Sequence, residues 1–312
     1  MIAYRAFTKR FGEQLAVDTL TLHVPAGETV ALLGPNGSGK TTSLKAAAGL
    51  IHPTSGEVLV GEPGRRAAQT EARAACSFLP QKVAFPETLS GREVVDFFRT
   101  LRGASAERTE EVLRLASLNG AGDRPVHTYS GGMVQRLGLA VAVLPDPPAL
   151  LLDEPTAALD PAGLAAFYAL VERRRRSGRT TLFTSHQLGD AERLADRVAV
   201  LVEGRLVGLF TERELARRLA DRGSMRVRLE ALTPAVLAAA REACHAAVSD
   251  GGDLIVPGSS ALRPVALERI RSAGGIVTGL TTEEGRLDTL FLELVEDSSK
   301  GRPGGVEGAG GA

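Results

Sequence analysis

The sequence predicts an α/β protein built on a mostly parallel sheet and followed by a smaller α+β domain. Three observations lead to this prediction. Strand-like apolar runs alternate with helical segments over most of residues 1–215, as in sheets whose parallel strands are joined by helices. One of these runs, residues 28–33, leads through a glycine-rich loop into a helix at residues 43–50. After Gly223 a second and shorter series of strand and helix patterns begins.

The glycine-rich loop fits the phosphate-binding pattern of Gly, four residues, Gly, Lys, and then Ser or Thr. Glycines let backbone N–H groups surround phosphate oxygens, and a helix N-terminus adds partial positive charge. Lys40 is expected to reach the β- and γ-phosphates, and the Thr41 hydroxyl to bind Mg²⁺. The flanking strand and helix argue against a chance match, so we expect a nucleoside triphosphate here. The residues expected to hold it are Gly34, Pro35, Asn36, Gly37, Ser38, Gly39, Lys40, Thr41 and Thr42.

Composition limits the class of protein. The length of 312 residues suggests about two domains, and an apolar content of 44% is ample for a sizeable core. The formal net charge is zero, so no nucleic-acid partner is expected. Cys76 and Cys244 lack metal-type spacing and are expected to be buried in a reducing cytosol. With no signal peptide evident and no apolar run of ~18 residues, we expect a soluble cytoplasmic protein.

The first strands leave one question open. Residues 2–7 and 19–24 alternate in the manner of short strands. Phe11 lies between them in a polar, glycine-containing turn, where an aromatic ring is unusual. From the residues alone, stacking on a nucleotide base and a core position at a turn are equally good interpretations.

Polar residues follow two of the later strands. Asp153 and Glu154 end one apolar strand, and His186 comes just past the end of the next strand. Ligands of parallel sheets bind at the carboxyl ends of the strands, so these side chains are expected on the same rim as the phosphate-binding loop. The strands are expected at residues 56–61, 77–79, 149–155, 180–184 and 197–202, and the helices at 64–75, 89–103, 106–118, 133–144, 162–177 and 188–195.

Beyond residue 223 the pattern predicts a βαββαβ-type sheet with helices on one face. We expect residues 223–297 to form a regulatory or dimer-supporting domain without an active site, and residues 298–312 to be a disordered tail. The last expected helix, residues 287–294, carries an apolar stripe. The stripe consists of Leu287, Leu290, Phe291 and Leu294. The strands are expected at residues 226–230, 246–248, 253–256 and 275–280, and the other helices at 234–244 and 264–272.

Five features stand in a fixed order after the phosphate-binding loop. They are Gln81, Ser130-Gly131-Gly132 at the start of a helix, Asp153-Glu154, Leu159-Asp160, and His186. In this order they closely resemble the ATP-binding cassette (ABC) ATPases, over residues 1–215, and disfavour a GTPase or a small-molecule kinase. The resemblance implies a P-loop NTPase fold for residues 1–222. It would have a RecA-like parallel sheet core, an antiparallel β subdomain and an inserted helical subdomain at residues 83–148.

The acidic pair and the glutamine have expected roles in the hydrolysis of Mg-ATP. Asp153 is expected to hold Mg²⁺ opposite Thr41, and Glu154 to orient and polarise the attacking water. The resemblance implies that Gln81 touches the Mg²⁺ and the water and senses the partner. A solvated turn is the simpler alternative for Gln81.

The resemblance also assigns the remaining nucleotide-site residues. It implies that His186 contacts the γ-phosphate, that Phe11 stacks on the base, and that Asp160 belongs to the nucleotide-binding set. A satisfied surface residue is the alternative for a lone histidine. No role is expected for His23, His52, His127 or His245.

Ser130, Gly131 and Gly132 match the family's signature motif, which forms a second anion site at a helix N-terminus. In this family two cassettes pack head to tail, and each signature closes over the ATP held by the other. The second cassette is therefore expected to be another copy of this chain or a paralogue. Met133 stands where glutamine is commonest and Ala158 where glycine is common, which are departures from the usual pattern.

The resemblance implies an ATPase that powers a membrane exporter. An integral membrane permease on a separate chain would dock on the helical subdomain and hold the cassette at the inner face of the cell membrane. Residues 86–93 resemble the cassette of the transporter that matures the copper sites of nitrous-oxide reductase, and antibiotic-efflux cassettes share much of this pattern. A soluble cassette protein of translation or DNA repair is the alternative. The basic run at residues 173–176 is expected to be a solvated helix end, not a nucleic-acid patch.

Overall fold

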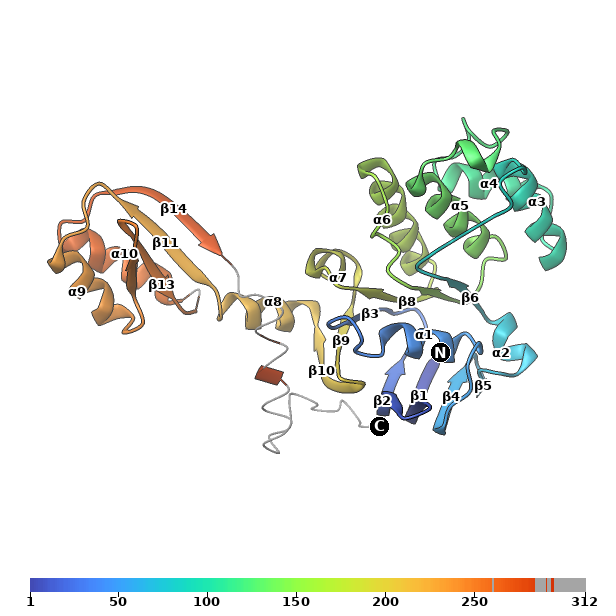
Figure 1. Ribbon diagram of the computed structural model, residues 1–312, viewed down its shortest axis with the longest axis horizontal. Helices are drawn as coiled ribbons and strands as arrows, with labels where there is room; N and C mark the ends of the chain where they lie inside the picture. Colours follow the sequence, from blue (N-terminus) through green and yellow to red (C-terminus); the bar gives the residue numbers. More distant parts are fainter. Residues whose placement is uncertain (260, 284–289, 291–292, 295–312) are drawn as a thin grey trace. The chain divides into compact units, whose positions relative to one another are not determined.

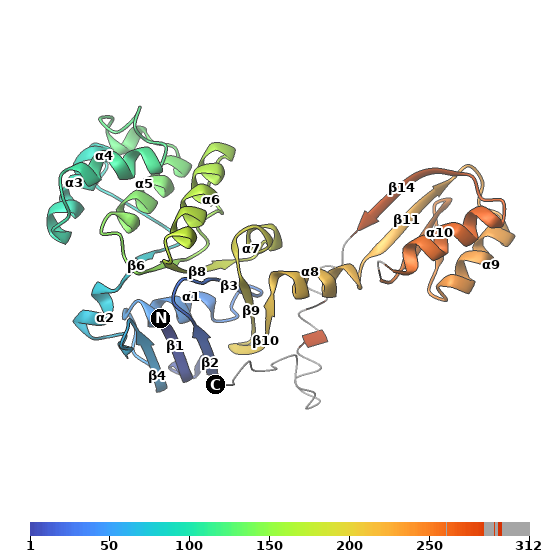
Figure 2. The ribbon, with the colours of Figure 1, turned by 180° about the vertical axis from the view of Figure 1, so that it is seen from behind.

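The computed structural model describes residues 1–259, 261–283, 290, 293 and 294 (Figure 1). By contacts the chain separates into two compact units, Met1–Glu212 and a second one from Arg213 onward. In both views of the first unit, the helices between residues 91 and 143 lie on one side of a mostly parallel sheet. An antiparallel sheet formed by strands within residues 2–66 lies on its other side (Figures 1 and 2).

A six-stranded sheet in the order β10-β9-β3-β8-β7-β6 forms the centre of the first unit. Five of its strands pair in parallel, and β10 pairs antiparallel with β9 at one edge. Every residue of β3, β7 and β8 is buried, as expected for strands covered on both faces. The strands are β3 (Thr29–Leu33), β6 (Cys76–Leu79), β7 (Ala149–Leu152), β8 (Thr180–Ser185), β9 (Arg197–Val202) and β10 (Arg205–Thr211).

Strand β10 is absent from the sequence-based prediction. It follows β9 through the two residues Glu203 and Gly204, whose φ angles are 48° and 82°. Two positive φ values in a two-residue loop are typical of the tight hairpin turn that matches strand twist. The short Glu-Gly pair was therefore a usable turn signal.

A second sheet is antiparallel, in the order β2-β1-β4-β5. The predicted strands at residues 2–7 and 19–24 are too short, because they extend into one hairpin that closes at Gly12 and Glu13. Phe11 is thus the last residue of a strand and does not lie in the turn. The predicted helix at residues 64–75 is also wrong in its first half, which forms β5. The elements are β1 (Ile2–Phe11), β2 (Gln14–Val24), β4 (Ser55–Val60), β5 (Arg65–Arg66) and α2 (Thr70–Ala74).

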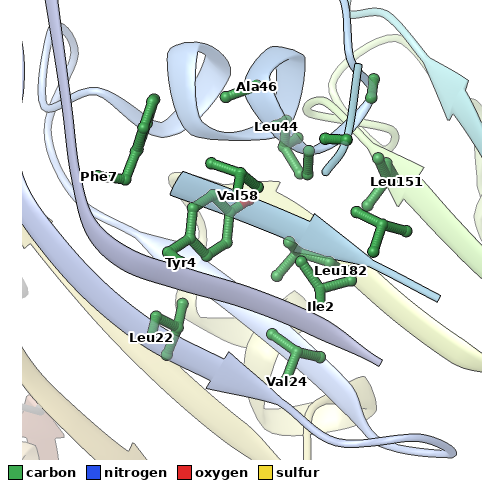
Figure 3. Close-up of a cluster of buried hydrophobic side chains, with 14 of the residues drawn as sticks. Ile2, Tyr4, Phe7, Leu22, Val24, Leu44, Ala46, Val58, Leu151 and Leu182 are labelled. Atoms are coloured by element: carbon green, nitrogen blue, oxygen red, sulfur yellow. The ribbon is translucent and has the colours of Figure 1, made fainter. Parts of the chain in front are cut away.

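Helix α1 (Lys40–Ala47) packs against strands of both sheets. Figure 3 shows Leu44 and Ala46 of this helix facing Tyr4 and Val58 of the antiparallel sheet. The buried Tyr4 hydroxyl also donates a hydrogen bond of 2.9 Å to the Ser43 carbonyl. Burying a large apolar side chain contributes roughly 1.5–3 kcal/mol, so this contact holds in place the helix that follows the phosphate-binding loop.

The helical group consists of α3 (Gly91–Arg102), α4 (Glu107–Leu115) and α5 (Gly131–Val143), with a short 3₁₀ turn, η1 (Val126–Thr128), before α5. Two further helices, α6 (Pro161–Arg176) and α7 (Leu188–Leu194), follow β7 and β8. Side chains cap three of these helices at their N-termini, where free backbone N–H groups need acceptors. Ser90 caps α3, Ser130 caps α5 and Asp160 caps α6.

The arginine run at the end of α6 is only partly a solvated helix end. Arg173 and Arg176 lie at the surface, where they pair with Glu111 and Glu172. Arg174 is buried and donates to the Pro147 carbonyl at 2.9 Å, so the prediction is wrong for this residue. Burial lowers the pKa of its guanidinium to about 10.

The second unit has the βαββαβ element order that the sequence predicts. Its sheet runs β12-β13-β11-β14, and Met225, Val227 and Leu229 of β11 alternate into a core shared with α9 and α10. The predicted helix at residues 287–294 and the tail lie mostly outside the described residues. The elements are β11 (Ser224–Leu229), α9 (Pro234–Ala243), β12 (Val248–Asp250), β13 (Asp253–Pro257), α10 (Leu262–Ser272) and β14 (Val277–Glu283), after α8 (Glu212–Ala220).

Two smaller expectations have clear outcomes. Cys76 is buried as predicted, and burial raises the pKa of its thiol to about 11, whereas Cys244 is only half-buried. In the part of the chain that the structure describes, none of the helices is both long and apolar enough to cross a membrane.

Candidate functional site

An open cavity of about 520 Å³ lies beside the phosphate-binding loop. It gathers side chains from β1, β2, the loop, α1 and the ends of β6 and β7. The cavity therefore brings together most of the nucleotide-site residues that the sequence predicts. Its lining consists of Phe11, Gln14, Ala16, residues 36–42, Gln81 and Glu154.

The loop has the backbone of an anion cradle. Gly37 and Gly39 have φ angles of 81° and 95°, in the left-handed region that favours glycine. A Cβ at Gly39 would lie 2.6 Å from the Ala16 carbonyl oxygen, whereas a Cβ at Gly37 would meet nothing within 4 Å. The buried Ser38 hydroxyl has no hydrogen-bond partner among the described residues. An open side and an unpartnered polar group both fit a phosphate ligand.

Lys40 is folded onto the loop. Its ammonium donates to the carbonyls of Gly34 and Pro35 at 2.7 and 2.9 Å. Burial lowers the pKa of this amine, while the nearby carboxylates of Glu154 and Asp153 act in the opposite direction. A buried cation at the cavity wall is well placed to bind phosphate oxygens.

A hydroxyl and a carboxylate meet where the Mg²⁺ is expected. The Thr41 hydroxyl donates to Asp153 Oδ1 at 3.0 Å, and Asp153 is only 2% exposed. Hard oxygen ligands of this kind suit Mg²⁺, which commonly takes its other ligands from substrate phosphates and water. Within the described ranges, no three His, Cys, Asp or Glu residues cluster as a metal site. Thr41 and Asp153 therefore fit a Mg²⁺ ion that takes its other ligands from phosphate oxygens and water.

Gln81, Glu154 and His186 come from the ends of three neighbouring strands and meet at one carboxylate oxygen. Gln81 Nε2 donates to Glu154 Oε2 at 2.9 Å, and His186 Nδ1 lies 3.5 Å from the same oxygen. Glu154 has a φ of 46°, which is uncommon for a residue other than glycine. The structure thus places Gln81 and His186 at the Glu154 carboxylate.

Thr184 is a site residue that the sequence-based analysis missed. Its hydroxyl donates to Asp153 Oδ1 at 2.8 Å and accepts from the Glu154 backbone N–H at 2.8 Å. In the parallel register Leu152 pairs with Phe183, so the next position places Asp153 beside Thr184. This register was the signal that could have identified it.

Phe11 lies at the mouth of the cavity and is 50% exposed. The Lys9 ammonium lies 4.9 Å from the centroid of its ring. An exposed ring at a ligand cavity leaves its face available for stacking on a base. Gln14 and Ala16 of β2 line the same wall and were also missed, because the expected strands stopped short of them.

The signature residues and Asp160 do not line this cavity. Ser130 and Gly131 are exposed at the N-terminus of α5, where the Ser130 hydroxyl accepts from the Met133 N–H at 3.2 Å. A Cβ on Gly132 would lie 2.9 Å from the Ala158 carbonyl oxygen, so the signature packs against the loop before α6. Asp160 caps α6 by accepting from the Gly163 N–H at 2.8 Å. These residues therefore lie outside the nucleotide cavity of their own chain.

Several known proteins are similar to this chain in sequence. The family model described as ABC transporter matches residues 17–157. A Nod factor export ATP-binding protein I from Burkholderia lata is 40% identical over 66% of this chain and 69% of its own length. A daunorubicin resistance ATP-binding protein, DrrA3 of Streptomyces coeruleorubidus, is 36% identical over 66% of this chain and 67% of its own.

A solved structure adds information on assembly. It is an ATP-binding cassette captured as a dimer in a post-hydrolysis state bound to ADP and Pi. It is 27% identical and superposes with a TM-score of 0.63 over 68% of this chain and 99% of its own.

We predict that Thr184→Val lowers ATP hydrolysis while nucleotide affinity without Mg²⁺ stays unchanged. Asp153 loses one hydrogen bond and the Glu154 N–H loses its acceptor, which is expected to cost on the order of 10- to 100-fold in turnover. Steady-state phosphate release and fluorescent-nucleotide titration measure the two effects.

Thr181→Val is the matched control. Thr181 is buried on the same strand, and its hydroxyl has no hydrogen-bond partner within the described part of the chain. Replacing it is expected to leave turnover unchanged. Equal activity in both variants would mean that Thr184 does not hold the acidic pair.

Proposed function

The chain belongs to the ABC transporter family of ATPases, and we propose that it powers an exporter whose permease is a separate chain. It binds and hydrolyses ATP, as this family does. The observation that supports ATP hydrolysis is that Thr41, Asp153 and Glu154 lie together beside the phosphate-binding loop. The relatives from Burkholderia lata and Streptomyces coeruleorubidus are named for export and drug resistance, which favours an exporter of the antibiotic-efflux type.

The chain's own residues divide the work of hydrolysis. Lys40 binds the β- and γ-phosphate oxygens once they displace the loop carbonyls that it now contacts. Thr41 and Asp153 hold Mg²⁺, which supplies charge neutralisation on the phosphates when bound. Glu154 orients and polarises the attacking water. Gln81 and His186 both contact Oε2 of the Glu154 carboxylate, and the proposed role of His186 is also to contact the γ-phosphate.

We further propose that two cassettes assemble head to tail. Ser130 and Gly131 are exposed and outside their own chain's nucleotide cavity, so a phosphate bound by them would belong to ATP held by another molecule. The similar cassette solved as a dimer with ADP and Pi supports assembly of two cassettes. The partner is a second copy of this chain or a paralogue, and Asp160 positions the signature through the loop that packs on Gly132.

A groove on the helical group is the proposed permease-docking surface. It has a volume of about 340 Å³ and is lined by the segment after β6 together with α3 and α5, including Phe85 and Phe98. Phe97 and Leu101 of α3 are 61% and 68% exposed in the same helix. An exposed apolar surface of this kind suits helices of a membrane protein and would hold the cassette at the inner face of the cell membrane.

The alternative is a soluble cassette protein acting in translation or DNA repair. Such proteins would show basic surfaces, whereas this chain has a formal net charge of zero. The copper-maturation subgroup and the regulatory or dimer-supporting role of residues 223–297 remain predictions from the sequence. In the described part of the second unit, the sheet and helices form a core of their own, as a separate domain requires.

We predict that Glu154→Gln retains ATP binding but loses turnover by about 100-fold or more, because general-base assistance is removed while the phosphate contacts remain. Lys40→Ala is expected to lose nucleotide affinity. Fluorescence titration and phosphate release separate the two effects.

One control is Lys45→Ala, which changes an exposed lysine of α1, the helix that begins at Lys40. The other is Glu71→Gln, which changes an exposed glutamate of α2. Both are expected to behave as the wild type. Full turnover in Glu154→Gln would reject the role assigned to Glu154.

We predict that the Glu154→Gln chain dimerises with ATP and that adding Ser130→Arg prevents this, because the new side chain occupies the phosphate position at the N-terminus of α5. Size-exclusion chromatography with light scattering measures the mass. Ser105→Arg adds the same charge at an exposed site before α4 and should leave the dimer intact. A dimer that survives Ser130→Arg would contradict the head-to-tail arrangement.

We predict that Phe97→Asp combined with Leu101→Asp releases the chain from native membranes without changing ATP binding. Cell fractionation followed by immunodetection measures the membrane-bound share. Leu50→Asp, a change at another exposed apolar residue, is the control. A chain that never associates with membranes would favour the soluble alternative.

A further inference from the structure

Asp190 of α7 is a buried carboxylate that the proposed chemistry does not use. It is only 3% exposed, and its oxygens accept hydrogen bonds from three hydroxyl groups. Thr156 donates at 2.6 Å, Tyr168 at 2.8 Å and Ser185 at 3.0 Å. A carboxylate taken out of water is costly unless such donors compensate, so this cluster is a specific arrangement.

The three hydroxyls come from three different segments. Thr156 lies two residues after Glu154, and Ser185 lies directly before His186. Both of these donate to the same oxygen, Asp190 Oδ2. Tyr168 of α6 donates to the other oxygen, Oδ1. One carboxylate oxygen therefore joins the segment that carries Glu154 to the segment that carries His186.

The Tyr168 contact is a separate support. Burial and the neighbouring Asp190 carboxylate raise the pKa of the Tyr168 phenol, which keeps it protonated as a donor. The Arg193 guanidinium lies 4.3 Å from the centroid of the Tyr168 ring. The hydrogen bond from Tyr168 to Asp190 joins α6 to α7. It does not involve the segment that carries Glu154 or the segment that carries His186, which are called the catalytic segments below.

Both catalytic segments need external support. Glu154 has a φ of 46°, a conformation that persists only when its surroundings hold it. The Glu154 N–H donates to the Thr184 hydroxyl. Two residues later, the Thr156 hydroxyl donates to Asp190 and so fixes the chain that follows Glu154. On the second segment the Ser185 hydroxyl also accepts from the Gln187 N–H at 3.0 Å, so this hydroxyl shapes the backbone around His186.

We propose that Asp190 is a positioning residue for ATP hydrolysis, which ties the Glu154 and His186 segments together through Thr156 and Ser185. The inference rests on the proposed roles of Glu154 and His186. The competing interpretation is an acid in the first turn of a short helix that contributes only to stability. That interpretation requires no coupling between the two catalytic segments.

The test is steady-state kinetics and thermal unfolding of the full chain with Mg-ATP. Asp190→Ala is expected to lower kcat by about 10- to 100-fold with little change in KM, because it leaves the phosphate-binding loop intact. Asp190→Asn keeps one oxygen for Thr156 and Ser185 and is expected to recover most of the lost kcat.

Tyr168→Phe is the matched control. It removes the third hydrogen bond but leaves the link between the catalytic segments, so kcat is expected to stay within about twofold of the wild type. A kcat loss in Tyr168→Phe as large as in Asp190→Ala would overturn the proposal, as would an Asp190→Ala chain that loses stability but keeps its kcat.

Two further variants separate the possible failures. If Asp190→Ala does not fold, the double variant Thr156→Val with Ser185→Ala removes the same two bonds, and wild-type kcat in it would reject the proposal. Full turnover in Glu154→Gln would instead reject the proposed chemistry. Loss of turnover in Glu154→Gln with normal kcat in Asp190→Ala would reject the positioning role alone.

Discussion

The hydrogen bond between Thr41 and Asp153 is the contact on which the site depends. It joins the helix after the phosphate-binding loop to the end of β7, two segments 112 positions apart in the chain. The contact forms because β3 and β7 both pair in parallel with β8, which brings their carboxyl ends to one edge. Packing of Leu44 against Tyr4 holds α1 against the antiparallel sheet as well. Mg²⁺ and the nucleotide phosphates need this spacing between hydroxyl and carboxylate.

The site could be predicted from the sequence where a local pattern carries the chemistry. The phosphate-binding loop has fixed spacing. Asp153, Glu154 and His186 each lie at or just past the end of a predicted strand, so strand ends alone place them on one rim. The alternation of strands and helices likewise predicted both the parallel sheet and the βαββαβ order of the second unit. Local propensity and the global fold agree in these segments.

Other features depend on contacts that no local pattern reveals. Thr184 and Asp190 look like ordinary polar residues of a strand and a helix, and only the register of β8 and the packing of α7 give them partners. The extent of the β1–β2 hairpin depends on pairing across the sheet, so the place of Phe11 at a strand end was missed. The burial of Arg174 depends on carbonyl groups of Pro147 and Thr180, which reach it only in the folded chain.

The measurement that tests the central claim most directly is the affinity of the ATP-bound chain for Mn²⁺, a paramagnetic substitute for Mg²⁺, followed by electron paramagnetic resonance. Asp153→Asn keeps the shape of the side chain and removes its charge. If Thr41 and Asp153 form the metal site, this change weakens Mn²⁺ binding on the order of 10-fold or more, while metal-free ATP affinity is retained. Unchanged Mn²⁺ affinity in Asp153→Asn would contradict the account.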